Sequence, residues 1–518
     1  MAEAAPGTPV SELQVAYLDG APRTLHALTT AGLVLGAVTD TSAMTEADVR
    51  ALLEADGVSD HLTALVTSVD IGAAKPDPAG IVEVLRRLGV SDPARALFVG
   101  DRPVDRDAAA SAGCAFVLVG ADHPLTVTVH RAFLDAGASP AAAAAALVGP
   151  VDARAAAEAD ARQLRLTKPA GALGRLEPLG SQLAAISGAV PPAVPEPVAV
   201  GLFAGDHGVL AEGVSPWPQE VTAQMIANVA GGGAAVNVLA RQVGASVTVV
   251  AVGVATPWPD GAGVVDRNVR AGTANLAEGP AMTVDEVRDA LDVGASVAFD
   301  LVAGGARVLV TGDMGIGNTT PSAALVSFFT GCLPADVTGR GTGIDDPTLA
   351  TKVAVIDRSV QRARATAGDV GAGEPVDATA ALAEVGGLEH AALAGFILGG
   401  AAARVPVVID GVVAASALLA AHALVPAVLP YVIAGHRSVE PGASAALGHL
   451  GLVPLLDLDL RLGEGTGALL AVPIVQAAAR ILAEMATFDE AGVSDKEPAT
   501  TNDLAGDEAG AGDRNPAL

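Results

Sequence analysis

Two short apolar runs in the second half of the chain each lead into a glycine-containing polar segment. Residues 198–202 run into Gly205-Asp206-His207-Gly208, and residues 307–310 run into the segment 312–320, which contains three glycines. Such apolar runs are typical of buried strands, and open α/β sheets bind ligands just beyond the carboxyl ends of their strands. The pattern predicts an α/β fold with a ligand site at these two loops.

Strand-like and helical stretches divide the chain into four segments. Residues 1–120 form a first α/β unit, residues 121–165 an alanine-rich linker with helices, and residues 166–488 a long α/β domain. The acidic tail, residues 489–518, is poor in large apolar side chains, so we expect it to be disordered. At 518 residues the chain has ample material for separate cores.

The charge balance restricts the partners. Lys and Arg total 30 against 58 for Asp and Glu, a formal charge of −28, which argues against a nucleic-acid partner or an anionic membrane surface. An anionic substrate must be held locally, by backbone N–H groups and a few cations. The only cysteines, Cys114 and Cys332, lie far apart, which indicates a reducing compartment without a disulfide framework or a zinc site. Without a secretory signal at residues 1–10, we expect a cytoplasmic protein.

One segment has the hydropathy of a membrane span. Between Gly411 and Gly435 few side chains are polar, but Pro426 and Pro430 interrupt the run and Asp410 precedes it. Prolines at these positions break a spanning helix. We therefore expect a buried helix, a loop and a strand inside a core.

The first α/β unit carries polar residues at the ends of its predicted strands. Thr39 follows one apolar run, Lys75 precedes an amphipathic helix, and Asp101 and Asp105 follow a second apolar run. Two aspartates four positions apart after a strand suit Mg²⁺, which prefers carboxylate oxygens. In this order the segments resemble motifs two to four of the haloacid-dehalogenase-like phosphatases. The resemblance implies a possible vestigial site at these four residues, with Mg²⁺ as a possible ligand.

The nucleophile of that phosphatase family is missing. The family places it in an Asp-x-Asp motif after the first strand, and Asp19 is a poor substitute because it sits where the family starts the next helix. Without a nucleophile the phosphoryl-aspartate chemistry cannot proceed. Either the motif lies upstream of Met1, or the unit is kept for packing or binding, and we favour an inactive or truncated domain.

Glu464, in the long α/β domain, lies directly between two glycines, Gly463 and Gly465. Glycine permits a left-handed backbone and close approach of a substrate, so this carboxylate can be aimed into a pocket. The plain alternative is a solvated carboxylate in a turn.

The loop at residues 312–320 precedes a helix expected to begin near Pro321. Its N–H groups and the helix N-terminus can hold a phosphate, and it has neither the Walker sequence nor the dinucleotide-binding spacing. The phosphate of a mononucleotide therefore fits better than ATP or NAD. Lys352 could add a point charge, although a lone lysine is more often a surface helix residue.

Many separate segments, in order over residues 166–488, resemble the nicotinate-nucleotide:5,6-dimethylbenzimidazole phosphoribosyltransferases. They are Asp206–Gly208, Trp217–Thr222, Gly272-Thr273, Gly279–Thr283, Met314–Thr320, Gly386–Glu389, Pro406–Gly411, His436–Ser438 and Leu462–Ala468. The resemblance implies a parallel-sheet, Rossmann-like large domain, a small helical subdomain built from both ends of the module, and a homodimer. Together with the preceding haloacid-dehalogenase-like domain, this gives an α/β chain of two α/β domains.

The implied reaction converts nicotinate mononucleotide and dimethylbenzimidazole into α-ribazole 5′-phosphate and nicotinate, for the lower ligand of cobalamin. By carry-over Glu464 is the general base, with Asp313 as a second catalytic carboxyl. The residues implied for the mononucleotide are Gly315, Gly317, Asn318, Thr319, Gly341, Lys352 and Ser438, and those for the benzimidazole are Ser215, Gln219 and Leu462. No cofactor or metal is expected, because no pyrophosphate leaves.

The residue types suit this chemistry. The pyridine nitrogen of the nucleotide is positively charged, so nicotinate leaves without a general acid, whereas the attacking azole must lose a proton from its second nitrogen. A carboxylate with a pKa raised by an apolar pocket can take that proton. Direct attack inverts β to α configuration, so no nucleophilic carboxylate is required.

Two departures from the family concern base selectivity more than reaction type. Asp313 stands where the family has Glu, and Ala443 replaces a His. Two alternatives stay open for the first unit: a phosphatase that removes the 5′-phosphate of the product, or a non-enzymatic docking module.

Overall fold

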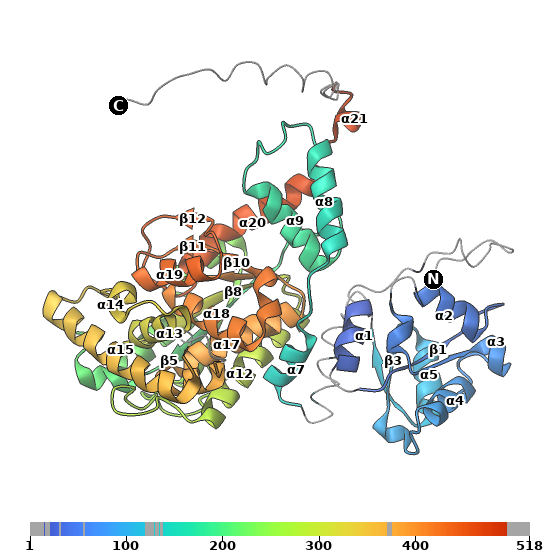
Figure 1. The fold of residues 1–518 in the computed structure, drawn as a ribbon, viewed down its shortest axis with the longest axis horizontal. Coiled ribbons are helices and arrows are strands. Elements are labelled where there is room, and N and C mark those ends of the chain that lie inside the picture. Colours follow the sequence, from blue (N-terminus) through green and yellow to red (C-terminus); the bar gives the residue numbers. More distant parts are fainter. Residues whose placement is uncertain are drawn as a thin grey trace, which may run out of the picture.

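The structure, a computed structural model, describes residues 21–30, 33–54, 57–119, 138–369 and 376–494, and the single positions 15, 129 and 134. Its larger part is a six-stranded sheet covered by helices on both faces, and a smaller α/β unit precedes it in the chain (Figure 1). The predicted fold class is confirmed.

The large sheet is parallel throughout, with the strand order β10-β9-β8-β5-β6-β7. Its strands are β5 (Val198–Gly205), β6 (Ser246–Gly253), β7 (Val265–Asp266), β8 (Val308–Met314), β9 (Val407–Ile409) and β10 (Val432–Ala434). Because β5 and β8 are neighbours, the two loops singled out in the sequence meet at one edge of the sheet. A small parallel pair, β11 (His436–Arg437) and β12 (Leu456–Asp457), lies outside this sheet.

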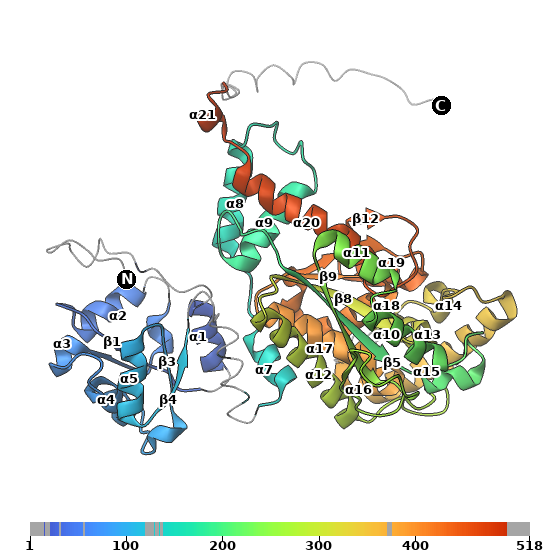
Figure 2. The ribbon, with the colours of Figure 1, turned by 180° about the vertical axis from the view of Figure 1, so that it is seen from behind.

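Alternate side chains of β5 enter two different cores. Ala199 and Phe203 join one cluster, and Val198, Val200 and Leu202 join the other, which explains why the strand is apolar at nearly every position. The first core is covered by α12 (Val284–Ala303), α13 (Thr319–Thr330), α17 (Leu388–Ala402) and α18 (Val412–Leu424). The second is covered by α9 (Leu176–Ser187), α10 (Glu220–Ala230), α11 (Ala235–Val243) and α20 (Thr466–Glu484), which can be followed in Figure 2.

Glycines set the crossing of α12 and α17. A Cβ at Gly294 would lie 1.7 Å from the carbonyl oxygen of Ala392, and one at Gly395 would lie 2.0 Å from that of Leu291. Side chains larger than hydrogen are therefore excluded at both positions. This crossing fixes α17, whose first turn carries buried polar residues beneath the site described below.

The apolar run after Asp410 is part of the core, as predicted. It forms α18, the 3₁₀ segment η6 (Pro426–Tyr431) and β10. Two other stretches, Glu220–Val243 and Thr466–Glu484, are long and apolar enough to cross a membrane by composition alone. The first is in fact α10 and α11 with the loop between them, and α20 packs on the sheet, so both serve the second core.

A small helical subdomain is assembled from both ends of the long α/β module and stands out from the main body (Figure 1). Ala159 of α8 (Ala153–Arg165), Ala184 of α9 and Leu482 of α20 form its core, and Leu166 bridges to Thr487. The module thus begins before the predicted boundary at residue 166. The short helix α21 (Phe488–Ala491) lies where the acidic tail was predicted to begin, and residues 495–518 of that tail are outside the described residues.

Part of the alanine-rich linker is built into the main body. Helix α7 (Pro140–Leu147) places Ala143, Ala144 and Leu147 in the first core, and the backbone N–H of Ala141 donates to Asp292 of α12 at 2.8 Å. Residues 121–137 lie outside the described residues apart from positions 129 and 134.

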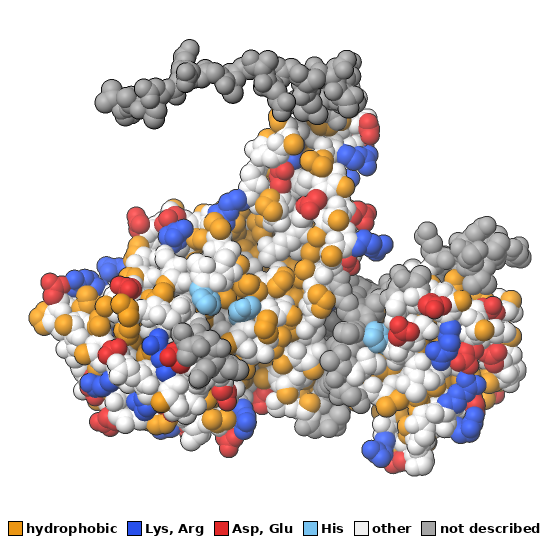
Figure 3. All heavy atoms as spheres, in the orientation of Figure 1, with side chains coloured by type: hydrophobic (Ala, Val, Ile, Leu, Met, Phe, Trp, Pro, Cys, Tyr) orange, Lys and Arg blue, Asp and Glu red, His pale blue; other side chains and the backbone are white. Residues whose placement is uncertain are grey.

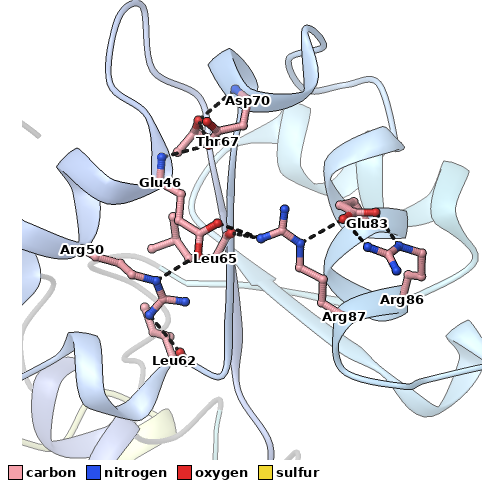
Figure 4. A network of polar contacts seen from close by, with 9 residues as sticks. All are labelled: Glu46, Arg50, Leu62, Leu65, Thr67, Asp70, Glu83, Arg86 and Arg87. Carbon is pink, nitrogen blue, oxygen red and sulfur yellow. Dashed lines mark hydrogen bonds and ion pairs between the residues drawn. The ribbon is translucent and has the colours of Figure 1, made fainter.

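The N-terminal unit contains two separate parallel strand pairs among its described residues, β1–β2 and β3–β4. Its elements are α1 (Ala21–Thr30), β1 (Gly36–Thr39), α2 (Glu46–Glu54), β2 (Ala64–Thr67), α3 (Ser68–Ile71), α4 (Ala79–Arg87), β3 (Leu97–Gly100), α5 (Pro103–Ala112) and β4 (Ala115–Leu118). Arg87 of α4 ties the unit together, because it contacts Glu46 of α2 at 2.7 Å and Glu83 at 2.9 Å (Figure 4).

The remaining α-helices of the described residues all pack against α13. They are α14 (Pro334–Val337), α15 (Asp346–Ala367), α16 (Ala378–Val385) and α19 (Pro441–His449). On the face drawn in Figure 3, Lys and Arg side chains occur singly or in small groups beside acidic ones rather than as one broad basic patch.

Candidate active site

A cavity of about 410 Å³ opens where the loops after β5, β8 and β10 converge. All but one of the predicted transferase residues line it: Ser215, Asp313, Gly315, Gly317, Asn318, Thr319, Gly341, Lys352, Ser438, Leu462 and Glu464. Gln219, the residue before α10, is half-buried but is not part of the lining, so its role stays a prediction. Residues predicted from separate parts of the sequence therefore line one cavity.

Other lining residues were not among the predicted site residues. An apolar wall is formed by Trp217, Val221, Met225, Val412 and Val413, and further polar groups come from Arg340, His436, Glu440 and Arg461. Trp217 and Val221 stand in a segment that the sequence singled out without giving either residue a role. An apolar wall beside a phosphate loop suits a ligand with one flat apolar ring and one anionic group.

Glu464 occupies a left-handed turn at the start of α20. Gly463, Glu464 and Gly465 have φ values of 83°, 63° and 92°, and a glutamate in this region carries a strain of about 1 kcal/mol or more. Its side chain is only 2% exposed, and the buried Oε2 atom has no hydrogen-bond partner in the described part of the chain. A strained backbone and an unsatisfied oxygen in one residue point to a functional group rather than a turn residue.

Asp410 holds this turn from behind. Its Oδ2 atom accepts a hydrogen bond from the backbone N–H of Gly465 at 3.0 Å, and its Oδ1 atom accepts those of Gly467 at 2.8 Å and Ala468 at 3.0 Å. One carboxylate thus satisfies three of the free N–H groups at the start of α20. Asp410 directly follows β9, just as Asp206 directly follows β5. The segment with Asp206 was singled out in the sequence because of this position after a strand.

Burial raises the pKa of Glu464, and the Asp410 charge adds to this effect against an opposing hydrogen bond from the backbone of Val236. A raised pKa makes the carboxylate a stronger base than an exposed glutamate. It remains able to accept a proton at the unpartnered oxygen.

Asp313 is the second carboxyl in the cavity. It is 6% exposed, and Asn318 donates a hydrogen bond from Nδ2 to its Oδ2 atom at 3.0 Å. Burial, followed by the charges of Asp410 and Glu389, raises its pKa well above the ordinary value. Because neighbouring buried carboxyls do not all ionise, we expect Asp313 to be the protonated member of the group and Glu464 to be the base.

The loop between β8 and α13 forms the polar end of the cavity. Gly317 has φ 91°, Asn318 precedes the helix, and the N–H of Ile316 donates to Thr222 at 3.1 Å. The open N-terminus of the twelve-residue helix α13 presents N–H groups to an anion.

Lys352 approaches this loop from α15. It is 1% exposed, and its Nζ atom donates to Thr319 Oγ1 at 2.8 Å and to the carbonyl oxygen of Gly339 at 3.3 Å. Burial lowers its pKa to about 8, against the attraction of Glu440. Because the side chain is buried, the alternative of a surface lysine is wrong. No carboxylate of the described residues forms an ion pair with this ammonium, and such a group calls for an anionic ligand.

The predicted N-terminal site has a different character. Lys75 contacts Asp105 Oδ1 at 2.6 Å, and Asp105 Oδ2 accepts the backbone N–H of Arg102 at 3.0 Å. Asp101 is exposed, and Thr39 ends β1 half-buried. Both oxygens of Asp105 are thus engaged, and the described residues contain no cluster of three His, Cys, Asp or Glu side chains suited to a metal. These residues do not fit Mg²⁺.

Comparisons with known proteins agree with the division of the chain into an N-terminal unit and a long α/β domain. A phosphoribosyltransferase family model matches residues 148–493, and a haloacid dehalogenase-like hydrolase model matches residues 8–119. The second match includes Asp19, but the residue two positions earlier is Tyr17, so the matched segment has no Asp-x-Asp motif before Thr39, where the family places its nucleophile.

Curated relatives cover the transferase part almost completely. The chain is 56% identical over 365 residues to the nicotinate-nucleotide–dimethylbenzimidazole phosphoribosyltransferase of Salinispora tropica, covering 68% of this chain and 98% of that protein. It is 53% identical over 349 residues to the protein of the same name from Chloroflexus aurantiacus, covering 67% and 97%. The crystal structure of CobT from Thermus thermophilus is similar with a TM-score of 0.63 and 47% identity, over 66% of this chain and 99% of that one.

Proposed function

The chain belongs to the nicotinate-nucleotide–dimethylbenzimidazole phosphoribosyltransferase family, and we propose that the 410 Å³ cavity is its active site, with Glu464 as the general base. The enzyme transfers the phosphoribosyl group of nicotinate mononucleotide to dimethylbenzimidazole, in the synthesis of the cobalamin lower ligand. The observation that carries the site assignment is the buried, unpartnered Glu464 Oε2 in the same cavity as the phosphate loop.

Different parts of the cavity bind the two substrates. The loop after β8 and Lys352 hold the 5′-phosphate, and the apolar wall at Trp217 and Val412 receives the benzimidazole. One azole nitrogen attacks C1′ while Glu464 takes the proton from the other, so the positive charge developing on the ring is neutralised as the bond forms. Nicotinate leaves as a neutral pyridine ring and needs no acid.

The reaction inverts the configuration at C1′ and requires no covalent intermediate. A neutral Asp313 supports this assignment, because it adds no second negative charge beside Glu464 and can offer a hydrogen bond instead. We propose that the transferase uses no cofactor and that the protein is a cytoplasmic homodimer.

Of the two departures from the family, one lies in the cavity. Asp313 is in the lining, whereas Ala443 is a buried residue of α19 outside it. Asp313 is one methylene shorter than the family's Glu. This change therefore affects base selectivity more directly than the change at Ala443. A pocket of this kind separates similar apolar bases by about 1–3 kcal/mol.

The Lys352 ammonium predicts how mononucleotide use depends on pH. Its pKa is about 8 in the free enzyme, so the charge is present at neutral pH and is lost as the pH rises above that value. We expect KM for nicotinate mononucleotide to rise about tenfold per pH unit well above pH 8, while kcat changes little because bound phosphate keeps the lysine protonated. Steady-state rates across this range measure both constants. Lys352→Met should show a high KM at every pH, and a wild-type KM that stays constant through the alkaline range would contradict the assignment.

The function is tested by incubating the protein with nicotinate mononucleotide and dimethylbenzimidazole, with and without Mg²⁺, and separating products by mass-resolved chromatography. We expect α-ribazole 5′-phosphate and nicotinate in equal amounts without added metal. Absence of both products would contradict the proposal and direct the search to other bases.

The same experiment examines the N-terminal unit. Because Lys75 and Arg102 engage Asp105 and no Asp-x-Asp motif stands before Thr39, we propose that the unit is not a phosphatase and that α-ribazole 5′-phosphate accumulates unchanged. Mg²⁺-dependent conversion to α-ribazole would instead support a bifunctional enzyme. Removal of residues 1–120 should leave the transferase kinetics intact, and loss of a co-purifying protein on this deletion would support a docking module.

A further inference from the structure

We propose that His207, Glu389, His390 and Ser322 form a buried positioning unit that holds the phosphate-binding loop at residues 315–318 in its binding shape. The inference rests on the proposed function, since it concerns how the cavity holds nicotinate mononucleotide. None of the four residues lines the cavity, and none takes part in the proton transfer at Glu464.

The unit centres on one carboxylate between two imidazoles. Glu389 Oε1 lies 2.9 Å from His207 Nε2 and 2.8 Å from His390 Nδ1, and all three side chains are completely buried. Glu389 and His390 are in the first turn of α17, and His207 follows β5. Groups of this kind are costly to bury and do not add stability by themselves, so their arrangement calls for a role.

The charges favour an ion pair inside this unit. Burial raises the pKa of Glu389, but His207 and His390 outweigh it and hold that pKa below the ordinary value. Burial likewise opposes the charged form of His207, but Glu389 and Asp206 outweigh it and raise the pKa of this imidazole. A charged pair fixes its geometry more firmly than a neutral hydrogen bond.

A chain of contacts runs from Glu389 to the loop. His390 Nε2 lies 2.8 Å from Ser322 Oγ, and that hydroxyl donates to the carbonyl oxygen of Asn318 at 2.8 Å. Asn318 in turn donates to Asp313 at 3.0 Å, inside the cavity. The residue that ends the phosphate loop is therefore held from behind through Ser322.

The loop also rests on His207. A Cβ at Gly315 would lie 2.3 Å from the carbonyl oxygen of Gly205 and 3.3 Å from His207 Nε2, and one at Gly317 would lie 3.9 Å from His207 Cβ. The close packing leaves the loop no room to move toward the unit. A misplacement of about 1 Å can lower the rate of an enzyme reaction about a hundredfold. Support of this kind therefore determines how well the N–H groups of the loop reach a phosphate.

The test uses the full-length chain with Ser322→Ala, and with Ser327→Ala as the matched control. Ser327 is equally buried in α13, but its hydroxyl donates to the carbonyl oxygen of Cys332, away from the loop. Titration calorimetry measures Kd for nicotinate mononucleotide alone and for dimethylbenzimidazole alone. We expect Ser322→Ala to weaken mononucleotide binding about five- to tenfold with base binding unchanged, and Ser327→Ala to change neither.

Glu389→Gln provides a second, independent variant. It removes the charge that both imidazoles share, and we expect a loss of about 10–100-fold in mononucleotide affinity, the size typical of losing a hydrogen bond to a charged group. The double variant with Ser322→Ala should be no weaker than Glu389→Gln alone, because both act through one unit. The inference is overturned if Ser322→Ala binds the mononucleotide within about twofold of wild type, or if both ligands weaken in parallel. A wild-type chain that binds no mononucleotide would overturn the proposed function instead.

Discussion

Replacing Glu464 by glutamine will lower kcat by about 10²–10⁴-fold while leaving the affinity for nicotinate mononucleotide within about twofold of wild type. Glutamine has nearly the same shape but cannot accept a proton from the azole, and in the proposed site the phosphate is held by other groups of the cavity, the loop after β8 and Lys352. Initial rates at saturating substrates measure the loss, and calorimetry with the mononucleotide alone measures binding. Glu484→Gln, an exposed residue at the far end of α20, is the control and should behave as wild type.

A second substitution separates chemistry from folding. Glu464→Gly should be as inactive as the glutamine variant, yet it should not lower Tm, because glycine adopts φ 63° without strain. Loss of activity together with retained stability marks a functional carboxylate. If Glu464→Gln keeps kcat within tenfold of wild type, the base lies elsewhere, and Asp313 is the next carboxyl to test.

Asparagine at position 410 is expected to damage both stability and turnover. Its amide group would place a donor against the N–H of Gly465 or against those of Gly467 and Ala468, since a single oxygen cannot replace both carboxylate oxygens. An unsatisfied buried N–H costs about 1–3 kcal/mol, so we expect the free energy of unfolding to fall by that amount and kcat to fall about a hundredfold as the turn relaxes.

The acid limb of the pH profile tests the electrostatic part of this role. The Asp410 charge helps to raise the pKa of Glu464, so Asp410→Asn should lower that pKa. Because Glu464 acts in its deprotonated form, the acid limb of kcat should move to lower pH than in wild type. Denaturant unfolding and a pH series of kcat measure the two effects. If the acid limb of kcat lies at the same pH as in wild type, Asp410 supports the turn but does not change the pKa of Glu464.

The loops after β5 and β8 were predictable because their signals are local. Glycines, a strand end and polar side chains stand together in the sequence at residues 312–320, and the same is true of Glu464 and its flanking glycines. Strand adjacency then brings both loops to one cavity without further information. The fold class followed from the same alternation of strands and helices.

The roles of Asp410 and Glu389 were not predictable in this way. Asp410 acts on N–H groups more than fifty positions later in the chain, and Glu389 of α17 contacts His207, which follows β5, so neither sequence neighbourhood shows the partner. The boundary at residue 166 failed for a related reason. Helix α8 is alanine-rich, and its packing partner Leu482 comes from the other end of the module.

The construction of the helical subdomain from both ends of the module has a consequence for biosynthesis. While the chain is still emerging from the ribosome, α8 and α9 are already made, but α20, which completes their core and carries the turn with Glu464 at its start, is not. A prematurely terminated product would therefore expose the apolar faces of α8 and α9 and would lack the base as well. We expect such fragments to be inactive and, through their uncovered apolar faces, more open to proteolysis than chains synthesised at least to the end of α20.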